Sequence, residues 1–380
     1  MAAGRTGSLE TLRRLNRLRV IDALRDEGLI SRAEIARRTG LSRSTVSSLV
    51  SELQADGLVV ERSEPAAAHG DQGGRPPILL SFDASAGVAV GIDFDHHHMR
   101  VAVSDLSSRI LAEAQVERSQ VIGAGLGLPG PVDQADGVIG SSAILPGWVG
   151  VAAAEELRRR LEVPVVVDND ANLGALAEFR HGAGRGASDL VYVKVASGIG
   201  AGLILGGRLY RGWGGMAGEL GHVLVEPEGA VCRCGNRGCL ETTASTPALL
   251  EVLRRSHGDL TVAEMLALAR DGDLGCRRVI ADAGRSVGQA AAFVFNVLNP
   301  QRLVVGGDLA AAGDLLLDGV RSSVRLAALP AAAEAARVVA GVLGERAQVL
   351  GALALAVGEA GAALDLPATI NQTIPGGGTT

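Results

Sequence analysis

Short apolar runs alternate with helical segments along residues 83–366, and this alternation constrains the possible folds most strongly. Runs such as Val88–Asp93, Val163–Val167 and Leu303–Gly307 have the length of β-strands. Strands that alternate with helices predict layers of α/β structure. Because 47% of the 380 residues are hydrophobic, the chain can bury a large core spread over two or three domains.

Residues 1–82 predict a smaller domain of a different kind. Apolar residues 18–24 mark a first helix, and Ser31–Glu34 has the spacing of a capping box that opens a second. A third helix carries a single apolar stripe of Val46, Leu49, Val50 and Leu53. Two short strands, 58–62 and 78–82, follow it. Three helices and a hairpin predict a winged helix-turn-helix, an α+β fold that binds double-stranded DNA.

The polar face of the third helix carries the predicted DNA contacts. Hydroxyl side chains at the start of such a helix reach base edges and phosphates, and an arginine neutralises a phosphate. The candidates are Arg43, Ser44, Thr45, Ser47 and Ser48. Residues 1–62 contain eleven arginines and eight acidic residues, so this part is basic although the net charge of the chain is −6. The alternative is a plain helical bundle with a solvated serine face.

Two segments rich in glycine and proline flank the predicted body. Arg75 lies within residues 73–77, where extended chain can insert an arginine into a minor groove or form a stiff linker, and both explanations remain open. We therefore assign residues 1–82 to the DNA-binding domain with its wing and linker, and 83–366 to the body. The last residues, 367–380, are expected to form a disordered tail.

Three of the four cysteines form a compact group with a histidine upstream. Cys232, Cys234 and Cys239 surround two glycines that allow a tight turn, and His222 lies ten residues before Cys232. Three thiolates and one imidazole form a closed tetrahedral set, which predicts one structural zinc ion per chain. Three incidental buried cysteines are the alternative. Cys276 stands apart and is expected to be a core thiol.

Six motifs of the body stand out together. They are Gly127-Leu-Pro-Gly-Pro-Val-Asp133, Leu145-Pro-Gly-Trp148, Asn169-Asp-Ala-Asn172, Gly218-Glu-Leu-Gly-His222, Cys232-Arg-Cys-Gly-Asn-Arg-Gly-Cys-Leu-Glu241 and Leu298-Asn-Pro-Gln-Arg-Leu-Val-Val-Gly-Gly307. The chain thereby resembles the ROK family of sugar kinases and sugar-responsive repressors over nearly its whole length. This resemblance implies an actin-like (ribonuclease H-like) α/β body. Its two lobes would be about 83–170 plus the C-terminal helix, and 171–345.

The resemblance also implies which residues contact a sugar. Asn169, Asp170, Glu219, His222 and Glu241 match the family's sugar contacts, and Asp170 matches the catalytic base of the kinases. Independently of the family, Asp170 follows a predicted strand and begins a helix, where α/β folds place ligands, although it can also act only as an N-cap. Carboxylates and amides are the acceptors that sugar hydroxyls need. The zinc is then a scaffold that orients His222 and Glu241.

One loop argues against phosphoryl transfer. Kinases of this family carry Asp-x-Gly-Gly-Thr after the first strand, whereas here Asp93 is followed by Phe-Asp-His-His-His98. Because the two glycines that admit phosphate are missing, we expect no kinase activity and regard Asp170 as a vestigial base. The three histidines are a metal or pH site, or, in the interpretation that we prefer, residues of a hairpin turn. Only Glu113–Gln120 separates the third strand from the next, which is too short for the helix usual in this family.

The sequence therefore predicts a sugar-sensing transcriptional repressor with a catalytically inactive body. Its expected partners are a palindromic DNA operator and a sugar or phosphosugar, and the chain is expected to form a homodimer or a tetramer. The alternatives are an active ATP-dependent sugar kinase with a DNA-binding head, and a DNA-binding scaffold whose sugar site is vestigial. The first 19 residues lack the apolar core of a signal peptide, and no apolar run reaches the roughly 18 residues of a membrane span. We therefore expect a cytoplasmic protein without a membrane partner.

Overall fold

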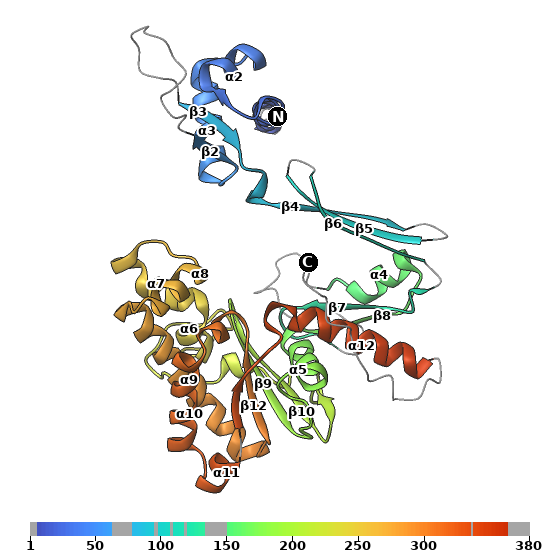
Figure 1. Cartoon of the computed structure of the whole chain (residues 1–380), viewed down its shortest axis with the longest axis vertical. Coiled ribbons are helices and arrows are strands. Elements are labelled where there is room, and N and C mark those ends of the chain that lie inside the picture. Colours follow the sequence, from blue (N-terminus) through green and yellow to red (C-terminus); the bar gives the residue numbers. More distant parts are fainter. Residues whose placement is uncertain are drawn as a thin grey trace. The chain divides into compact units, whose positions relative to one another are not determined.

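The computed structural model describes residues 6–62, 78–94, 98–106, 109–117, 120–133, 150–335 and 337–363. The chain forms two compact units, Met1–Gln120 and Val121–Thr380, whose helices and strands are labelled in Figure 1. Several features singled out in the sequence lie outside the described residues. They are Arg75, the histidines at 96 and 97, the motif at 145–148 and the tail at 367–380.

The head, residues 6–62 and 78–82, consists of three helices and a small antiparallel sheet. Its elements are α1 (Thr6–Glu27), β1 (Ile30–Ser31), α2 (Arg32–Thr39), α3 (Arg43–Ala55), β2 (Val59–Arg62) and β3 (Leu79–Phe82). β3 lies between β1 and β2 and pairs with both in antiparallel fashion. The predicted helix-turn-helix and its hairpin are therefore confirmed, and the plain helical bundle is wrong.

The apolar stripe of α3 forms the centre of the head. Its four residues are buried, and they pack against α1, α2 and the sheet through Val20, Leu24, Ile35 and Leu80. Ser31 caps α2 by accepting a hydrogen bond from the Glu34 backbone N–H at 3.3 Å, as predicted. The Glu34 carboxylate does not complete a capping box but forms ion pairs with Arg37 and Arg38. Capping at Ser31 thus begins α2, and burial of the stripe fixes α3.

A three-stranded antiparallel sheet follows the head within the same unit. After a short 3₁₀ turn, η1 (Ala84–Ala86), it consists of β4 (Val88–Phe94), β5 (His98–Asp105) and β6 (Ile110–Glu117), with β5 in the centre. Between β6 and β7, the part of the chain that the structure describes contains no α-helix, and Val88, Val90 and Ile110 are more than half exposed. The sheet therefore presents apolar side chains that no described helix of its own unit covers.

The larger unit contains the rest of the described chain. Two parallel strands, β7 (Ala124–Leu128) and β8 (Val165–Asn169), lie beside α4 (Ala153–Leu161) and α12 (Ala347–Ala363). A five-stranded sheet has the order β11 (Arg208–Tyr210), β10 (Ile199–Leu205), β9 (Leu190–Val195), β12 (Arg302–Gly306) and β13 (Arg337–Ala340). The remaining helical elements are α5 (Asp170–His181), η3 (Leu220–His222), α6 (Leu240–Ala244), α7 (Thr246–His257), α8 (Val262–Arg270), α9 (Leu274–Leu298), η4 (Asp308–Ala312), α10 (Asp314–Ala327), α11 (Pro330–Ala335) and η5 (Gly344–Arg346).

Helices cover both faces of the five-stranded sheet. Alternate residues of β9 point to opposite sides, so Val191, Val193 and Val195 join a core with α9 and α10, while Leu190 and Tyr192 join a second core with α5. Figure 1 shows α9 and α10 on one side of the sheet and α5 on the other. This is the α/β layering expected of an actin-like body, and it places the ends of β8 and β9 beside α5.

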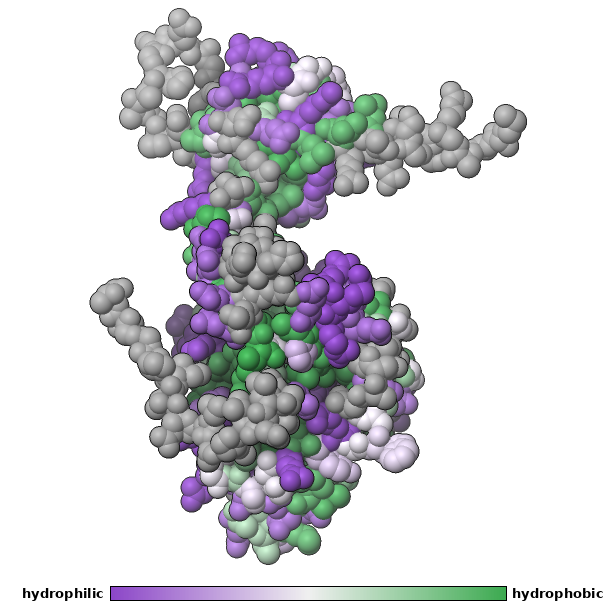
Figure 2. Space-filling model, turned by 90° about the vertical axis from the view of Figure 1, so that its right-hand side faces the viewer, coloured by the Kyte–Doolittle hydropathy of each residue, from purple (hydrophilic) through white to green (hydrophobic). Residues whose placement is uncertain are grey.

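The surface is mixed in polarity. Figure 2 shows hydrophilic residues at the end of the head where α2 lies in Figure 1, and both hydrophobic and hydrophilic residues at the end of the larger unit where α11 lies in Figure 1. Among the exposed apolar side chains of that unit, Leu326 is 84% exposed and Leu329 is 66% exposed. None of the described helices is long and apolar enough to cross a membrane.

Candidate ligand site and metal centre

Three consecutive polar residues, Asp168, Asn169 and Asp170, lie where β8 ends and α5 begins. Asn169 caps α5, because its Oδ1 accepts hydrogen bonds from the backbone N–H groups of Ala171 at 2.8 Å and Asn172 at 3.3 Å. Its Nδ2 donates to the Gly130 carbonyl at 2.8 Å, which ties α5 to the loop after β7. Asp170 is the first residue of the helix rather than its cap. The explanation of Asp170 as an N-cap alone is therefore wrong, and its carboxylate is available for other contacts.

Two acidic residues at the end of β8, Asp168 and Asp170, each form an ion pair with a basic side chain. Lys194 on β9, the single lysine of the chain, contacts Asp170 with its Nζ 2.6 Å from Oδ2, and about a fifth of each side chain is exposed. Arg211 forms an ion pair with Asp168 at 2.7 Å. The Asp168 side chain is 1% exposed and also accepts a hydrogen bond from Asn172 Nδ2 at 2.8 Å. Burial of such a carboxylate is tolerable only with these partners.

Close backbone packing sets the position of Glu219. A Cβ atom at Gly218, whose φ is +99°, would lie 1.9 Å from the Ala201 carbonyl oxygen, and one at Gly221 would lie 2.2 Å from that of Ile199. Only glycine lets this segment lie directly against β10. Burial raises the pKa of the Glu219 carboxyl, because desolvation disfavours its charged form. Glu219 is therefore a carboxyl group held in a partly dry setting.

Glu241 lies at the start of α6 and is 8% exposed. Its Oε2 accepts a hydrogen bond from the Ile199 backbone N–H at 3.1 Å, and its Oε1 forms an ion pair with Arg233 at 2.8 Å. Arg233 stands between two cysteines of the zinc motif, and Glu241 follows the last of them by two residues. The cysteine segment thus positions both members of this ion pair.

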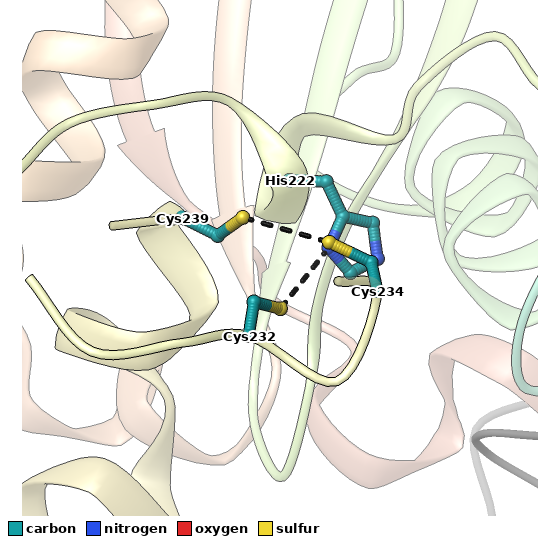
Figure 3. Close-up of side chains that lie close together, drawn as sticks. All are labelled: His222, Cys232, Cys234 and Cys239. Atoms are coloured by element: carbon teal, nitrogen blue, oxygen red, sulfur yellow. Dashed lines mark hydrogen bonds between the residues drawn. The ribbon is translucent and has the colours of Figure 1, made fainter. Parts of the chain in front are cut away.

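The four predicted metal ligands lie together, as Figure 3 shows. One donor atom each from His222, Cys232, Cys234 and Cys239 lies within 4.8 Å of the other three. Zn–S bonds of about 2.3 Å and Zn–N bonds of about 2.0 Å in a tetrahedron require S···S edges of about 3.8 Å and S···N edges of about 3.6 Å. The Cys234–Cys239 Sγ distance is 3.7 Å, and the distance from Cys232 Sγ to His222 Nδ1 is 3.6 Å. This knuckle therefore has the donors and the spacing of a tetrahedral zinc site.

The second ring nitrogen of His222, Nε2, faces the carboxylate of Glu219. Its Nε2 lies 3.7 Å from Glu219 Oε2, while its Nδ1 faces the cysteines. A ligating imidazole is commonly oriented by a carboxylate on its other nitrogen. His222 therefore links the knuckle to Glu219, which is the arrangement that a structural metal with an orienting role requires.

The start of α3 carries the predicted DNA contacts on its surface. Arg43, Ser44, Ser47 and Ser48 are exposed, whereas Thr45 is half-buried. The Ser42 hydroxyl caps the helix and lies 2.9 Å from Ser44 Oγ and 2.8 Å from Thr45 Oγ1. The three hydroxyls form one local network, so a phosphate or base that approaches here meets preoriented donors and acceptors.

The structure brings together most of the predicted ligand residues and adds charged partners that the sequence had not indicated. Asp170 and Glu241 both lie near enough to Glu219 that, after burial, their charges also raise the pKa of its carboxyl group. The residues that sequence reasoning missed are Asp168, Lys194, Arg211 and Arg233. The uniqueness of Lys194 in the chain was a signal that could have singled it out.

The fold and the arrangement of these residues define a class: a helix-turn-helix head joined to an α/β body that carries a group of acidic side chains beside a cysteine knuckle. Residues 99–359 match the ROK family and residues 13–68 match the MarR family. The chain belongs to the ROK family.

Several relatives align with both the head and the body of this chain. A xylose repressor of Caldicellulosiruptor bescii is 29% identical, with 93% of this chain and 98% of that protein covered. The DNA-binding transcriptional dual regulator NagC of Escherichia coli is 31% identical, with coverages of 92% and 94%. The crystal structure of a ROK family transcriptional regulator homologous to the E. coli MLC protein matches with 25% identity and a TM-score of 0.58, over 92% of this chain and 96% of that one. A ROK glucokinase from Streptomyces griseus, in complex with glucose and AMPPNP, is 29% identical with a TM-score of 0.57, over 71% and 99%.

Proposed function

We propose that this ROK protein is a sugar-responsive transcriptional repressor that binds DNA through α3 and a sugar through the acidic site around Asp170. The observation that carries the proposal is the presence, in one chain, of an exposed polar α3 in a helix-turn-helix and of that acidic site in the body. Relatives named as repressors or transcriptional regulators align with head and body alike. A head that binds DNA and a body that binds a small molecule are the two parts that a controlled repressor needs.

On the DNA side, the proposed contacts divide into two kinds. Arg43 neutralises a phosphate, which adds affinity without sequence preference. Ser44, Thr45, Ser47 and Ser48 reach base edges and neighbouring phosphates, which adds preference. A homodimer would place two such helices on a palindromic operator, one or two helical turns of DNA apart.

On the sugar side, the proposed ligands are Asn169, Asp170, Glu219, His222 and Glu241. The carboxylate and amide oxygens accept hydrogen bonds from sugar hydroxyls, His222 offers its Nε2, and the zinc knuckle would hold His222 and Glu241 in place when the metal is bound. Lys194 and Arg233 pair with Asp170 and Glu241, and Arg211 pairs with the neighbouring Asp168. Three cations against four carboxyl groups leave the site slightly acidic, because Glu219 pairs with none of the three. This favours a neutral sugar over a phosphosugar, and a panel of sugars and phosphosugars tests both.

The second candidate function is an active sugar kinase with a DNA-binding head, and the likeness to a glucokinase favours it. Against it, Lys194 Nζ lies 2.6 Å from Asp170 Oδ2, so a cation already pairs with the carboxylate that would act as the base, although the second oxygen can still accept a hydrogen bond from a sugar. The sequence of the first turn of the body also lacks the glycines that a phosphate needs. We therefore propose a sensor rather than an enzyme, acting in the cytoplasm where its DNA lies.

A gel-shift titration on DNA upstream of the protein's own gene, with and without a panel of sugars and phosphosugars, tests the proposal. We expect binding of the free protein and release by one member of the panel. A thermal-shift measurement with the same panel separates a sensor from a scaffold with a vestigial site. Binding to DNA with no thermal response to any sugar supports the scaffold, and sugar-dependent ADP release supports the kinase.

A further inference from the structure

A second group of metal-binding side chains lies in the larger unit and shares no residue with the knuckle. His257 is the last residue of α7, Asp273 caps the start of α9, and Cys276 lies in the first turn of α9. One donor atom of each residue lies within 4.8 Å of the other two. We propose that these three residues bind a second divalent transition-metal ion, of which Zn²⁺ is the best fit, independently of the knuckle.

The distance between the imidazole and the carboxylate suits such an ion. His257 Nε2 lies 3.2 Å from Asp273 Oδ1. Zn–N and Zn–O bonds of about 2.0 Å in a tetrahedron require an N···O edge of about 3.3 Å. The imidazole is also fixed from its other side, because the Ser256 hydroxyl lies 2.7 Å from Nδ1. A polar partner on the second nitrogen is the usual way in which a protein orients a histidine ligand.

The nature of the donors selects the class of metal. One thiolate, one imidazole and one carboxylate suit Zn²⁺ and its neighbours Co²⁺ and Ni²⁺, while Mg²⁺ and Ca²⁺ prefer oxygen alone. Cys276 is completely buried, whereas 19% of the His257 side chain and 32% of the Asp273 side chain are exposed. The ion would thus be anchored by a buried sulfur and face solvent on one side. Three protein ligands leave a fourth position for water, unlike the closed set of the knuckle.

The absence of a side chain at Gly275 leaves space for the imidazole of His257. A Cβ atom at Gly275 would lie 2.9 Å from His257 Cε1 and 3.3 Å from Asp273 Oδ1. Gly275 is the second residue of α9, where most other residues would support the helix better. Its absence of a side chain therefore keeps open the space in which His257 approaches Asp273.

Helix capping explains only part of this arrangement. Asp273 Oδ1 accepts a hydrogen bond from the Cys276 backbone N–H at 2.8 Å, so the carboxylate would lie near the start of α9 without any metal. Capping does not require a buried thiol and an oriented imidazole beside the same oxygen. A metal ion uses all three groups and joins the end of α7 to the start of α9.

Cobalt substitution of the full-length protein tests the proposal. Metal-free protein is titrated with Co²⁺ while the sulfur-to-cobalt charge-transfer absorption and the d–d bands are recorded. We expect two equivalents to bind, and the one-thiolate site to add about a third of the charge-transfer intensity of the three-thiolate knuckle. A Cys232→Ala/Cys234→Ala variant should keep one equivalent, bound through Cys276. His257→Gln and Cys276→Ala should each keep only the knuckle equivalent.

His181→Gln is the matched control, because His181 also ends a helix and is exposed. It should keep both equivalents. A wild-type stoichiometry of one that Cys276→Ala leaves unchanged, or a His257→Gln protein that still binds two, overturns the proposal. Because two substitutions at different positions, His257→Gln and Cys276→Ala, report on the same site, a folding defect in one of them leaves the other as the test. The outcome is also independent of the proposed repressor function, which DNA binding and sugar response test separately.

Discussion

Replacement of Arg211 by methionine removes the cation that compensates the buried Asp168. The Asp168 side chain is 1% exposed, while Arg211 is 25% exposed. Breaking a buried ion pair by loss of one partner costs about 3–5 kcal/mol, because the remaining charge stays desolvated. Asp168 keeps hydrogen bonds from the Asn169 backbone N–H and from Asn172 Nδ2, both at 2.8 Å. We therefore expect the lower end of that range, about 3 kcal/mol.

Urea unfolding of the zinc-loaded protein, followed by circular dichroism, measures this loss. With an m-value of about 3 kcal/mol/M, the midpoint of the larger unit should fall by about 1 M. Arg208→Met is the control, because Arg208 is exposed and begins β11, the strand that Arg211 directly follows, and it should leave the midpoint nearly unchanged. Adding Asp168→Asn to Arg211→Met should restore part of the stability, since no uncompensated charge remains. If Arg211→Met unfolds within about 0.5 kcal/mol of Arg208→Met, the pair does not carry the energy assigned to it.

Three further outcomes are expected. Cys234→Ala should lose the knuckle metal, measured by metal analysis, together with the sugar response, because the knuckle positions Glu241. The wild-type protein should release no sugar-dependent ADP in a coupled assay at rates on the order of 1 per second, because the turn after Asp93 lacks the two glycines that admit a phosphate. Arg43→Ala should weaken binding to all DNA sequences alike and lower the salt slope by about 1 per head, measured by fluorescence anisotropy, whereas Ser47→Ala should change base preference. Unchanged affinity of Arg43→Ala at low salt would mean that α3 is not the recognition helix.

Local patterns of the sequence predicted the head well. Four residues at helical spacing, Val46 to Leu53, were enough to identify the buried face of α3, because burial follows the helical period directly. The knuckle was equally visible, since three of its four ligands lie within eight consecutive residues. In both cases, the partners are close in sequence, so local spacing carries the information.

The charged partners of the ligand site were not predicted. Arg211 is 43 residues from Asp168, and Lys194 is 24 residues from Asp170. Each of these ion pairs forms only when elements distant in the sequence, such as α5 and β9, pack together. The periodicity of the sequence gives no information about that packing. Cys276 was expected to be an isolated core thiol, and its burial is confirmed. Its proximity to His257 appears only when α7 and α9 are folded together.

The central claim is that a sugar bound at the acidic site controls DNA binding by the head. A ligand can do this only through unequal affinity for two states, and a coupling of about 1–3 kcal/mol gives roughly 5–150-fold weaker DNA binding. Glu219 is proposed to supply part of that difference, as a partly dry acceptor for a sugar hydroxyl.

The most direct test is therefore the operator affinity of Glu219→Ala, measured with and without the sugar that releases the wild-type protein. The exposed Glu228→Ala is the control and should respond as the wild type does. We predict that Glu219→Ala binds the operator with wild-type affinity and is not released by the sugar. Release at the same sugar concentration as the wild type would contradict the account, because the acidic site would then not be the sensor.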